Sequence, residues 1–207
     1  MTATEPAAAR PASRLAAIAG VGAAVLLFCA AIAVWFVGPR LDQADMSGIG
    51  GPFTLEDGQG HTVTNAAFRG KYMLIYFGYT SCPDICPTTL DTIASALDKL
   101  GADANRLSTL FITVDPQRDT PAVVARYAAA FSSKIEGLTG TAQQIASVAR
   151  EYRVYYAIHR TGSGPNDYTV DHSSIIYLIG PNGRFVAPIP SAGSPDEMAA
   201  AIRKHIT

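Results

Sequence analysis

The sequence has few cysteines, a near balance of charges and no basic run. Only three cysteines occur in 207 residues, namely Cys29, Cys82 and Cys86. Three are too few for a scaffold held together by disulfides. The net charge is −1, and without a basic stretch nucleic acid is not an expected partner. A chain of this length has room for one globular domain with accessory segments.

Charge is absent altogether from one long segment, residues 15–37. As a helix these residues would rise about 34 Å, which is enough to cross a bilayer with some tilt. Arg10 and Arg14 precede the segment and no acidic residue follows Glu5 on that side. This bias predicts that the N-terminus stays in the cytoplasm. Trp35 lies where an interfacial aromatic residue is expected.

Two alternatives to an uncleaved anchor stay open. A cleavable signal peptide could end near residues 31–33, but apolar residues continue through Val37 and the segment is long for a signal sequence. A lipoprotein could use Cys29, but bulky Phe28 precedes it where a small residue is expected. In an anchor, Cys29 is a small hydrophobic residue and not part of a functional site.

We therefore divide the chain into four segments. Residues 1–14 are a cytoplasmic tail and residues 15–37 a transmembrane anchor. Residues 38–51, which mix Gly, Asp and Ser, read as a linker. Residues 52–207 form the globular domain, which this orientation places in the periplasm, tethered to the inner membrane.

Within the domain, buried strands alternate with helices. Two nearly continuous apolar runs, residues 71–79 and 107–114, predict strands buried on both faces. Helical spacing follows each run, over residues 87–100 and from Thr120 onward, and a capping box of Thr141 and Gln144 predicts a third helix.

Shorter elements complete the pattern. The sequence predicts an entry hairpin over residues 53–64, a short strand over 154–158, a hairpin of strands 173–179 and 184–187, and a last helix from Ser194. This order predicts an α/β fold of the thioredoxin-like type, with a mixed sheet flanked by helices and preceded by one transmembrane helix. The close cysteine pair falls at the end of the first central strand.

Three residues separate Cys82 from Cys86. If Pro87 is the first helical residue, Cys86 occupies the N-cap and Cys82 lies in the loop before it. The unpaired amides and positive end of a helix stabilise an anion, which predicts lowered thiol pKa values. A loop this short gains little stability from a disulfide alone. The pair is therefore predicted to bind a soft metal or to act as a redox-active pair that forms a disulfide.

Two thiolates leave a copper ion under-coordinated, and imidazole is a suitable third ligand for Cu(I) or Cu(II). His172 directly precedes the predicted strand 173–179, at the junction that faces the cysteine loop in a thioredoxin-like fold. We therefore predict a copper site formed by Cys82, Cys86 and His172. The other histidines are most simply surface or loop residues: His61, His159 and His205.

The turn over residues 114–121 has two interpretations. In the favoured one, Asp115 follows a strand and Asp119 or Thr120 caps a helix. In the other, Asp115 lies near the cysteines, because strand ends at this edge of an open sheet line the site crevice. Asp115, or Asp171 beside His172, would then orient a metal ligand by a hydrogen bond.

Three segments in this order resemble the Sco/SenC family of membrane-anchored copper proteins. They are residues 78–87 (GYTSCPDICP), 114–121 (VDPQRDTP) and 170–178 (VDHSSIIYL). The resemblance covers the chain from Pro52 onward. It implies a thioredoxin-like domain that binds one copper ion through Cys82, Cys86 and His172. It also implies delivery of copper, or of reducing equivalents, to the binuclear copper centre of cytochrome c oxidase.

The leading hypothesis is a non-enzymatic copper metallochaperone. Its expected partners are the membrane, the cytochrome c oxidase subunit that carries the binuclear centre, and other copper chaperones or thioredoxin-like reductants. The main alternative is a thiol–disulfide oxidoreductase that keeps the acceptor's cysteines reduced. Disulfide exchange needs neither the wide cysteine spacing nor His172. A redox or copper sensor is a third hypothesis. A thiol peroxidase is disfavoured because the second cysteine lies too close for a resolving role.

Overall fold

The computed structural model describes residue 28 and residues 48–206. The chain divides into two compact units, Met1–Met46 and Ser47–Thr207, and the account below concerns the second. The predicted tail, the predicted anchor apart from Phe28, and linker residues 38–47 lie outside the described residues. Within the described part of the chain, none of the helices combines the length and apolar character needed to span a bilayer.

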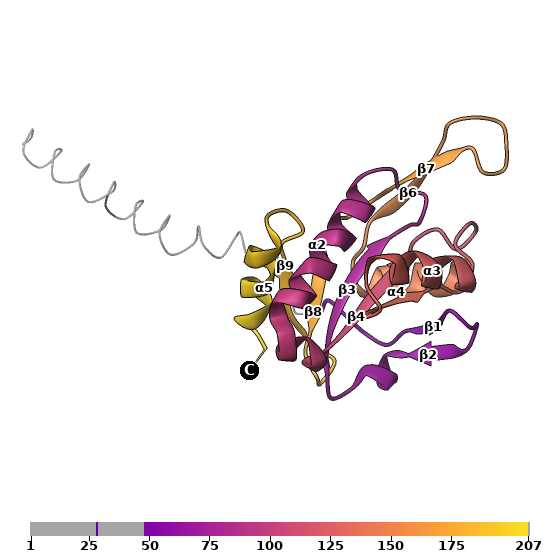
Figure 1. The fold of residues 1–207 in the computed structure, drawn as a ribbon. Coiled ribbons are helices and arrows are strands. Elements are labelled where there is room, and N and C mark those ends of the chain that lie inside the picture. Colours follow the sequence, from indigo (N-terminus) through magenta and orange to yellow (C-terminus); the bar gives the residue numbers. More distant parts are fainter. Residues whose placement is uncertain (1–27, 29–47, 207) are drawn as a thin grey trace, which may run out of the picture. The chain divides into compact units, whose positions relative to one another are not determined.

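A five-stranded mixed sheet forms the centre of the domain (Figure 1). Its order is β5-β4-β3-β8-β9. β3, β4 and β5 run parallel to one another, β8 is antiparallel to β3, and β9 is antiparallel to β8. The strands are β3 (Tyr72–Gly78), β4 (Leu107–Thr113), β5 (Ile135–Leu138), β8 (Ile176–Ile179) and β9 (Phe185–Ile189).

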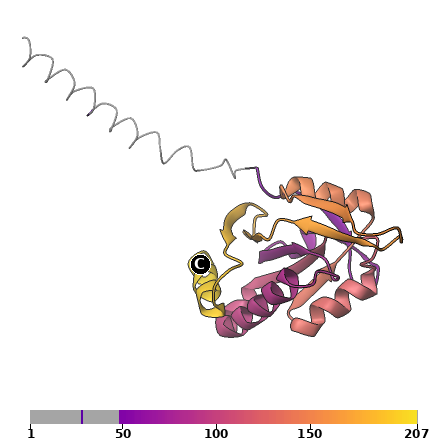
Figure 2. The ribbon, with the colours of Figure 1, turned by 90° about the horizontal axis from the view of Figure 1, so that it is seen from above.

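Helices cover both faces of this sheet, as Figure 2 shows. α2 (Ile85–Leu100), α3 (Pro121–Phe131) and α5 (Pro195–Arg203) lie on one face, and α4 (Ala142–Glu151) lies on the other. The strand order, the parallel and antiparallel pairing and the two helical layers confirm the predicted α/β, thioredoxin-like fold.

The predicted sequence signals explain most of these elements. Every residue of β3 after Tyr72 is buried, as a strand covered on both faces requires. The predicted capping box is present at the start of α4, and a second one, in which Ser194 and Glu197 bond reciprocally, begins α5. α2 ends at Gly101, whose φ of 58° suits glycine.

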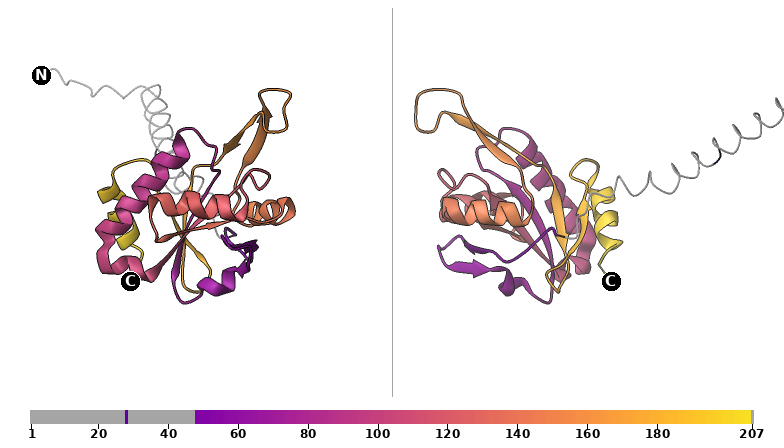
Figure 3. Two further views of the ribbon diagram at one scale, coloured as in Figure 1. Left: turned by 45° about the vertical axis from the view of Figure 1, so that its right-hand side comes forward. Right: turned by 180° about the vertical axis from the view of Figure 1, so that it is seen from behind.

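Smaller elements surround the sheet. β1 (Thr54–Glu56) and β2 (Thr62–Thr64) form the predicted entry hairpin. Short 3₁₀ helices follow at η1 (Asn65–Phe68) and η2 (Gly101–Arg106). A second hairpin, β6 (Tyr156–Arg160) with β7 (Tyr168–His172), pairs only within itself and projects beyond the sheet (Figure 3).

Three predictions of elements need correction. β5 and β7 were not predicted, because they contain Gly137 and Asp171, residue types that are uncommon in strands. The strand predicted over residues 173–179 begins only at Ile176, so His172 ends β7 and does not open β8. α2 begins at Ile85, two residues before Pro87, so Cys86 is helical and Asp84 is the N-cap residue.

Gly137 in β5 permits the close contact between this strand and α3. A Cβ atom at this position would overlap the carbonyl of Val124 in the helix backbone, which cannot rotate away. We therefore expect Gly137→Ala to lower the free energy of unfolding by about 1–3 kcal/mol, measured by urea denaturation. Glu136→Ala is the control, since this neighbour is exposed and should change stability by less than about 0.5 kcal/mol. Equal stability of the two variants would contradict the packing described.

Candidate metal centre

The end of β3 and the start of α2 hold the two cysteines. Cys82 lies in the loop between them, and its N–H donates to the Tyr79 carbonyl at 3.2 Å. Cys86 is in the first turn of α2, and its N–H donates to the Cys82 sulfur at 3.4 Å. Both residues are free thiols. The helix start therefore directs a backbone amide at the Cys82 sulfur.

The Cys86 side chain is fully buried, and Gly78 makes room for it. A Cβ atom at Gly78 would lie 2.8 Å from the Cys86 sulfur and 2.8 Å from the Phe111 ring. A larger residue at the end of β3 would therefore push this sulfur out of place.

His172 reaches the cysteines from the end of β7. Its Nε2 lies 3.2 Å from the Cys86 sulfur, although 86 positions separate the two residues. Its Nδ1 lies 3.2 Å from the Ser173 carbonyl oxygen, which can only accept a hydrogen bond. Nδ1 therefore carries the proton, and the lone pair on Nε2 faces the sulfurs.

The two sulfurs and the imidazole nitrogen all lie within 4.8 Å of one another. This is the one group of at least three potential metal ligands from His, Cys, Asp and Glu found in the described part of the chain. Bonds of roughly 2.0–2.3 Å to sulfur and nitrogen place ligand atoms about 4 Å apart across an ion. The donor set therefore fits one soft metal ion after small side-chain movements.

Burial sets the protonation of two of these groups. It raises the pKa of the Cys86 thiol to about 12, because a thiolate there would lose its solvation. The predicted lowering of the thiol pKa is therefore wrong for Cys86, whose sulfur sits in the core and not beside the open amides. Burial lowers the pKa of His172, which favours the neutral imidazole that a metal requires.

Two tyrosines enclose the imidazole. The rings of Tyr76 and Tyr79 meet the His172 ring edge-on, with centroids 6.3 Å and 5.8 Å away. Neither was singled out from the sequence. Tyr79 belongs to the cysteine segment and could have been flagged there, whereas Tyr76 is one aromatic residue among several in a buried strand.

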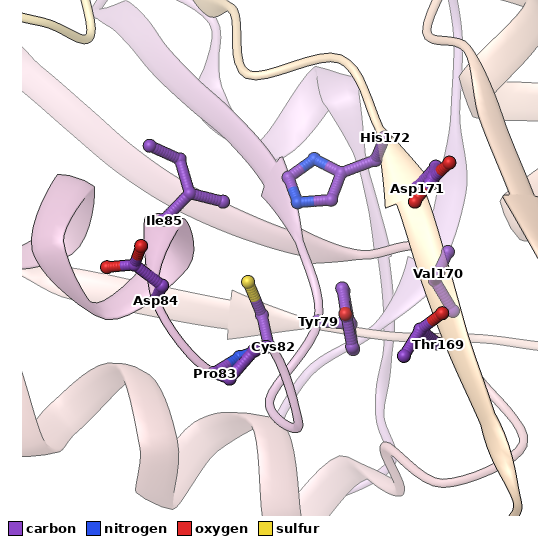
Figure 4. Close-up of a pocket in the computed structure, with 9 residues that line it drawn as sticks. All are labelled: Tyr79, Cys82, Pro83, Asp84, Ile85, Thr169, Val170, Asp171 and His172. Atoms are coloured by element: carbon purple, nitrogen blue, oxygen red, sulfur yellow. The ribbon is translucent and has the colours of Figure 1, made fainter. Parts of the chain in front are cut away.

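A surface pocket of about 490 Å³ opens in front of the group. Figure 4 shows the Cys82 sulfur and the His172 ring facing this pocket from the loop and from β7. Cys86 does not line it and lies behind the other two. The lining residues come from the cysteine loop and from β7: Tyr79, Cys82, Pro83, Asp84, Ile85, Thr169, Val170, Asp171 and His172.

The two candidate carboxylates contact other partners. Asp115 is buried and bonds Arg118 and the hydroxyl of Tyr168. The carboxylate of Asp171 pairs with His159 Nε2 at 3.0 Å on an exposed surface. No hydrogen bond joins either aspartate to the side chains of the Cys–Cys–His group among the contacts described.

The remaining polar predictions have mixed outcomes. Thr120 is the N-cap residue of α3 but makes no side-chain capping bond, and Asp119 instead bonds Thr80. His61 and His159 are largely exposed, as expected for surface residues. His205 is partly buried.

Comparison with known proteins gives an extensive match. The family model described as SCO1/SenC matches residues 41–207. The bovine protein SCO2 homolog, mitochondrial, is 44% identical over 162 residues, which cover 75% of this chain and 59% of that protein. The human protein SCO1 homolog, mitochondrial, is 42% identical over 164 residues, which cover 76% of this chain and 53% of that protein. The chain thus spans between half and three-fifths of these two relatives.

Solved structures agree with these sequence matches. ScoI from Bradyrhizobium japonicum, solved with copper bound, is 44% identical with a TM-score of 0.69, covering 76% of this chain and 99% of that one. Yeast Sco1 with copper bound is 39% identical with a TM-score of 0.72, covering 77% and 88%. With most of the domain matched in sequence and in fold, the chain belongs to the SCO1/SenC family.

Proposed function

We propose that this protein is a copper metallochaperone that binds one copper ion through Cys82, Cys86 and His172. The observation that carries the proposal is the convergence of two sulfurs and one imidazole nitrogen within 4.8 Å. Thiolate ligands select soft ions such as Cu(I), and imidazole suits both oxidation states of copper. Two similar proteins, ScoI from Bradyrhizobium japonicum and yeast Sco1, have been solved with copper bound.

The position of the group supports delivery in preference to permanent retention. Cys82 and His172 line an open pocket, so a partner's ligand can approach the ion from that side. Cys86 holds the ion from behind. A transfer in which incoming ligands displace the outer two first, and Cys86 last, fits this arrangement.

We infer that the acceptor is the binuclear copper centre of cytochrome c oxidase, with other copper chaperones or thioredoxin-like reductants as upstream partners. This assignment rests on the family to which the chain belongs. We further propose that residues 15–37 anchor the protein in the inner membrane, with residues 1–14 cytoplasmic and the domain from residue 52 periplasmic after a linker over 38–51. The uncharged segment after Arg10 and Arg14 supports this topology.

One observation favours a second candidate, thiol–disulfide exchange. Cys82 lies at the pocket with an amide donating to its sulfur, and Cys86 lies directly behind it. A Cys82 thiolate would attack a partner disulfide and release one partner thiolate. Cys86 would then attack the Cys82 sulfur, release the second partner thiolate and leave a Cys82–Cys86 disulfide, so two electrons pass to the partner. The pKa of about 12 for Cys86 slows the second attack, which is why copper delivery ranks first.

Replacing the imidazole tests the ligand set. Loss of a residue that only hydrogen-bonds a metal ligand typically weakens metal binding by about 10- to 100-fold. We expect His172→Ala, which removes a ligand itself, to weaken Cu(I) binding by more than this. In the Cu(II) form, absorption and electron paramagnetic resonance should lose the signature of nitrogen coordination. His159→Ala is the matched control, since this imidazole lies on the surface in the same hairpin. An unchanged spectrum and affinity in His172→Ala would refute the ligand set.

Copper binding should also release protons. Because the pKa of the Cys86 thiol is about 12, this group is protonated between about pH 6 and about pH 9 and must lose its proton to bind copper. The apparent Cu(I) affinity should therefore rise at least about tenfold per pH unit over that range. Competition with a chelator of known pH dependence measures the slope. His172→Ala should keep this slope, and a flat profile in the wild type would exclude Cys86 as a ligand.

The two sulfurs should differ in reactivity. In a Cys29→Ala background, we expect the Cys86→Ser variant to react quickly with an aromatic disulfide reagent through Cys82. The Cys82→Ser variant should react at least about tenfold more slowly, because the Cys86 sulfur is fully enclosed and its pKa is high, whereas Cys82 is 9% exposed and lines the pocket. Equal rates would contradict the described placement of the pair.

A further inference from the structure

The turn between β4 and α3 bonds both to the cysteine loop and to the strand that bears His172. We propose that Asp115, Arg118 and Tyr168 form a clamp that positions β7, and thereby His172, against the cysteines. These three are positioning residues, since none of them is among the proposed ligands. The consequence for copper rests on the proposed function, whereas the consequence for the His172 ring does not.

One side of this turn fixes the cysteine loop. The buried carboxylate of Asp119 accepts hydrogen bonds from the Thr80 amide at 2.9 Å and from the Thr80 hydroxyl at 2.6 Å. It also accepts one from the Thr113 hydroxyl at the end of β4. Thr80 stands two residues before Cys82, so Asp119 ties the start of the cysteine loop to the sheet.

The other side of the turn fixes the start of β7. Arg118 Nε donates to one carboxylate oxygen of Asp115, and the Tyr168 hydroxyl donates to the other at 2.7 Å. The Arg118 guanidinium stacks on the Tyr168 ring at 3.8 Å and its Nη1 donates to the Tyr168 carbonyl at 3.0 Å. Arginine suits this role because its planar fork can stack and donate at once.

Backbone hydrogen bonds within the turn link its two sides. The N–H groups of Arg118 and Asp119 both donate to the Asp115 carbonyl, at 3.2 Å and 3.0 Å. This five-residue turn therefore connects the loop of Cys82 to the strand of His172.

This connection matters because the hairpin that carries His172 lies outside the central sheet. β6 and β7 pair with each other in a two-stranded sheet that is separate from the five-stranded sheet, and they project beyond it in Figure 3. Ladder bonds therefore cannot set the register of His172 against the cysteines. Tyr168 is the first and His172 the last residue of the five-residue strand β7, so the contacts of Tyr168 hold the end of the strand opposite to His172.

The clamp can be tested without metal, because the His172 ring lies edge-on to Tyr76 and Tyr79. In the full chain, purified in detergent with labelled histidine, ring currents should shift the His172 resonances away from solvent values. We expect Arg118→Met, which keeps an apolar stem over Tyr168, to move these resonances toward those of exposed His61. Tyr168→Phe, which loses only the bond to Asp115, should produce a smaller movement in the same direction.

Arg160→Met is the matched control. Arg160 lies in the same hairpin, but its guanidinium donates to the Gly164 carbonyl within the hairpin itself. Its loss should leave the His172 resonances in place. Urea unfolding of all variants shows whether a change in the His172 resonances comes from lost positioning or from a less stable domain. If Arg118→Met does not fold, the His172 resonances of Tyr168→Phe test the clamp.

With copper, Arg118→Met should weaken Cu(I) binding by about 10- to 100-fold and reduce nitrogen coupling in the Cu(II) spectrum. The rate at which Cys82 reacts with a disulfide reagent should stay unchanged, because Asp119 still holds its loop. Unshifted His172 resonances in both variants would overturn the inference. Absence of copper binding in the wild type would instead refute the proposed function, and the resonances would still decide whether the clamp exists.

Discussion

The contact between the Cys86 sulfur and His172 Nε2, at 3.2 Å, is the interaction on which the site depends. It joins the first turn of a helix to the end of a peripheral strand. The central sheet supplies one partner directly, because β3 ends at Gly78 and leads into the cysteine loop. The other partner comes from a hairpin outside that sheet. Contacts other than the backbone hydrogen bonds of the central sheet must therefore bring the sulfurs and the imidazole nitrogen together.

The two sulfurs differ in how deeply they are buried. Cys82 faces a pocket and receives an amide hydrogen bond, whereas Cys86 is enclosed and its pKa is raised to about 12. The pair thus combines a largely buried sulfur that lines a pocket with one that is fully enclosed. That asymmetry suits the proposed delivery of copper, and it makes Cys82 the first sulfur to react in the alternative, disulfide exchange. The same low-polarity surroundings keep His172 neutral.

The turn Asp115–Asp119 was recognised in the sequence as a motif but its role was not. From the sequence, its residues are interpreted as helix caps or as neighbours of the cysteines. In the structure Asp119 does not cap the helix but accepts hydrogen bonds from Thr80 in the cysteine loop, and Asp115 bonds Arg118 and Tyr168. Tyr168 lies 53 positions from Asp115. With the same local sequence, a carboxylate at a turn can cap a helix or bond a distant side chain. Only its partners from other parts of the chain show which of these it does.

The sequence by itself determined the strands and helices with long or well-capped patterns, such as β3, β4 and α2. It also determined the cysteine pair at the end of a central strand, and through three motifs the family. Only the tertiary structure decided that His172 ends a separate hairpin, that Cys86 is protonated in the core, and that Arg118 braces β7. The physical reason is range. Periodicity and capping act over a few neighbouring residues, whereas desolvation and hydrogen bonding at this site depend on groups brought together from across the chain.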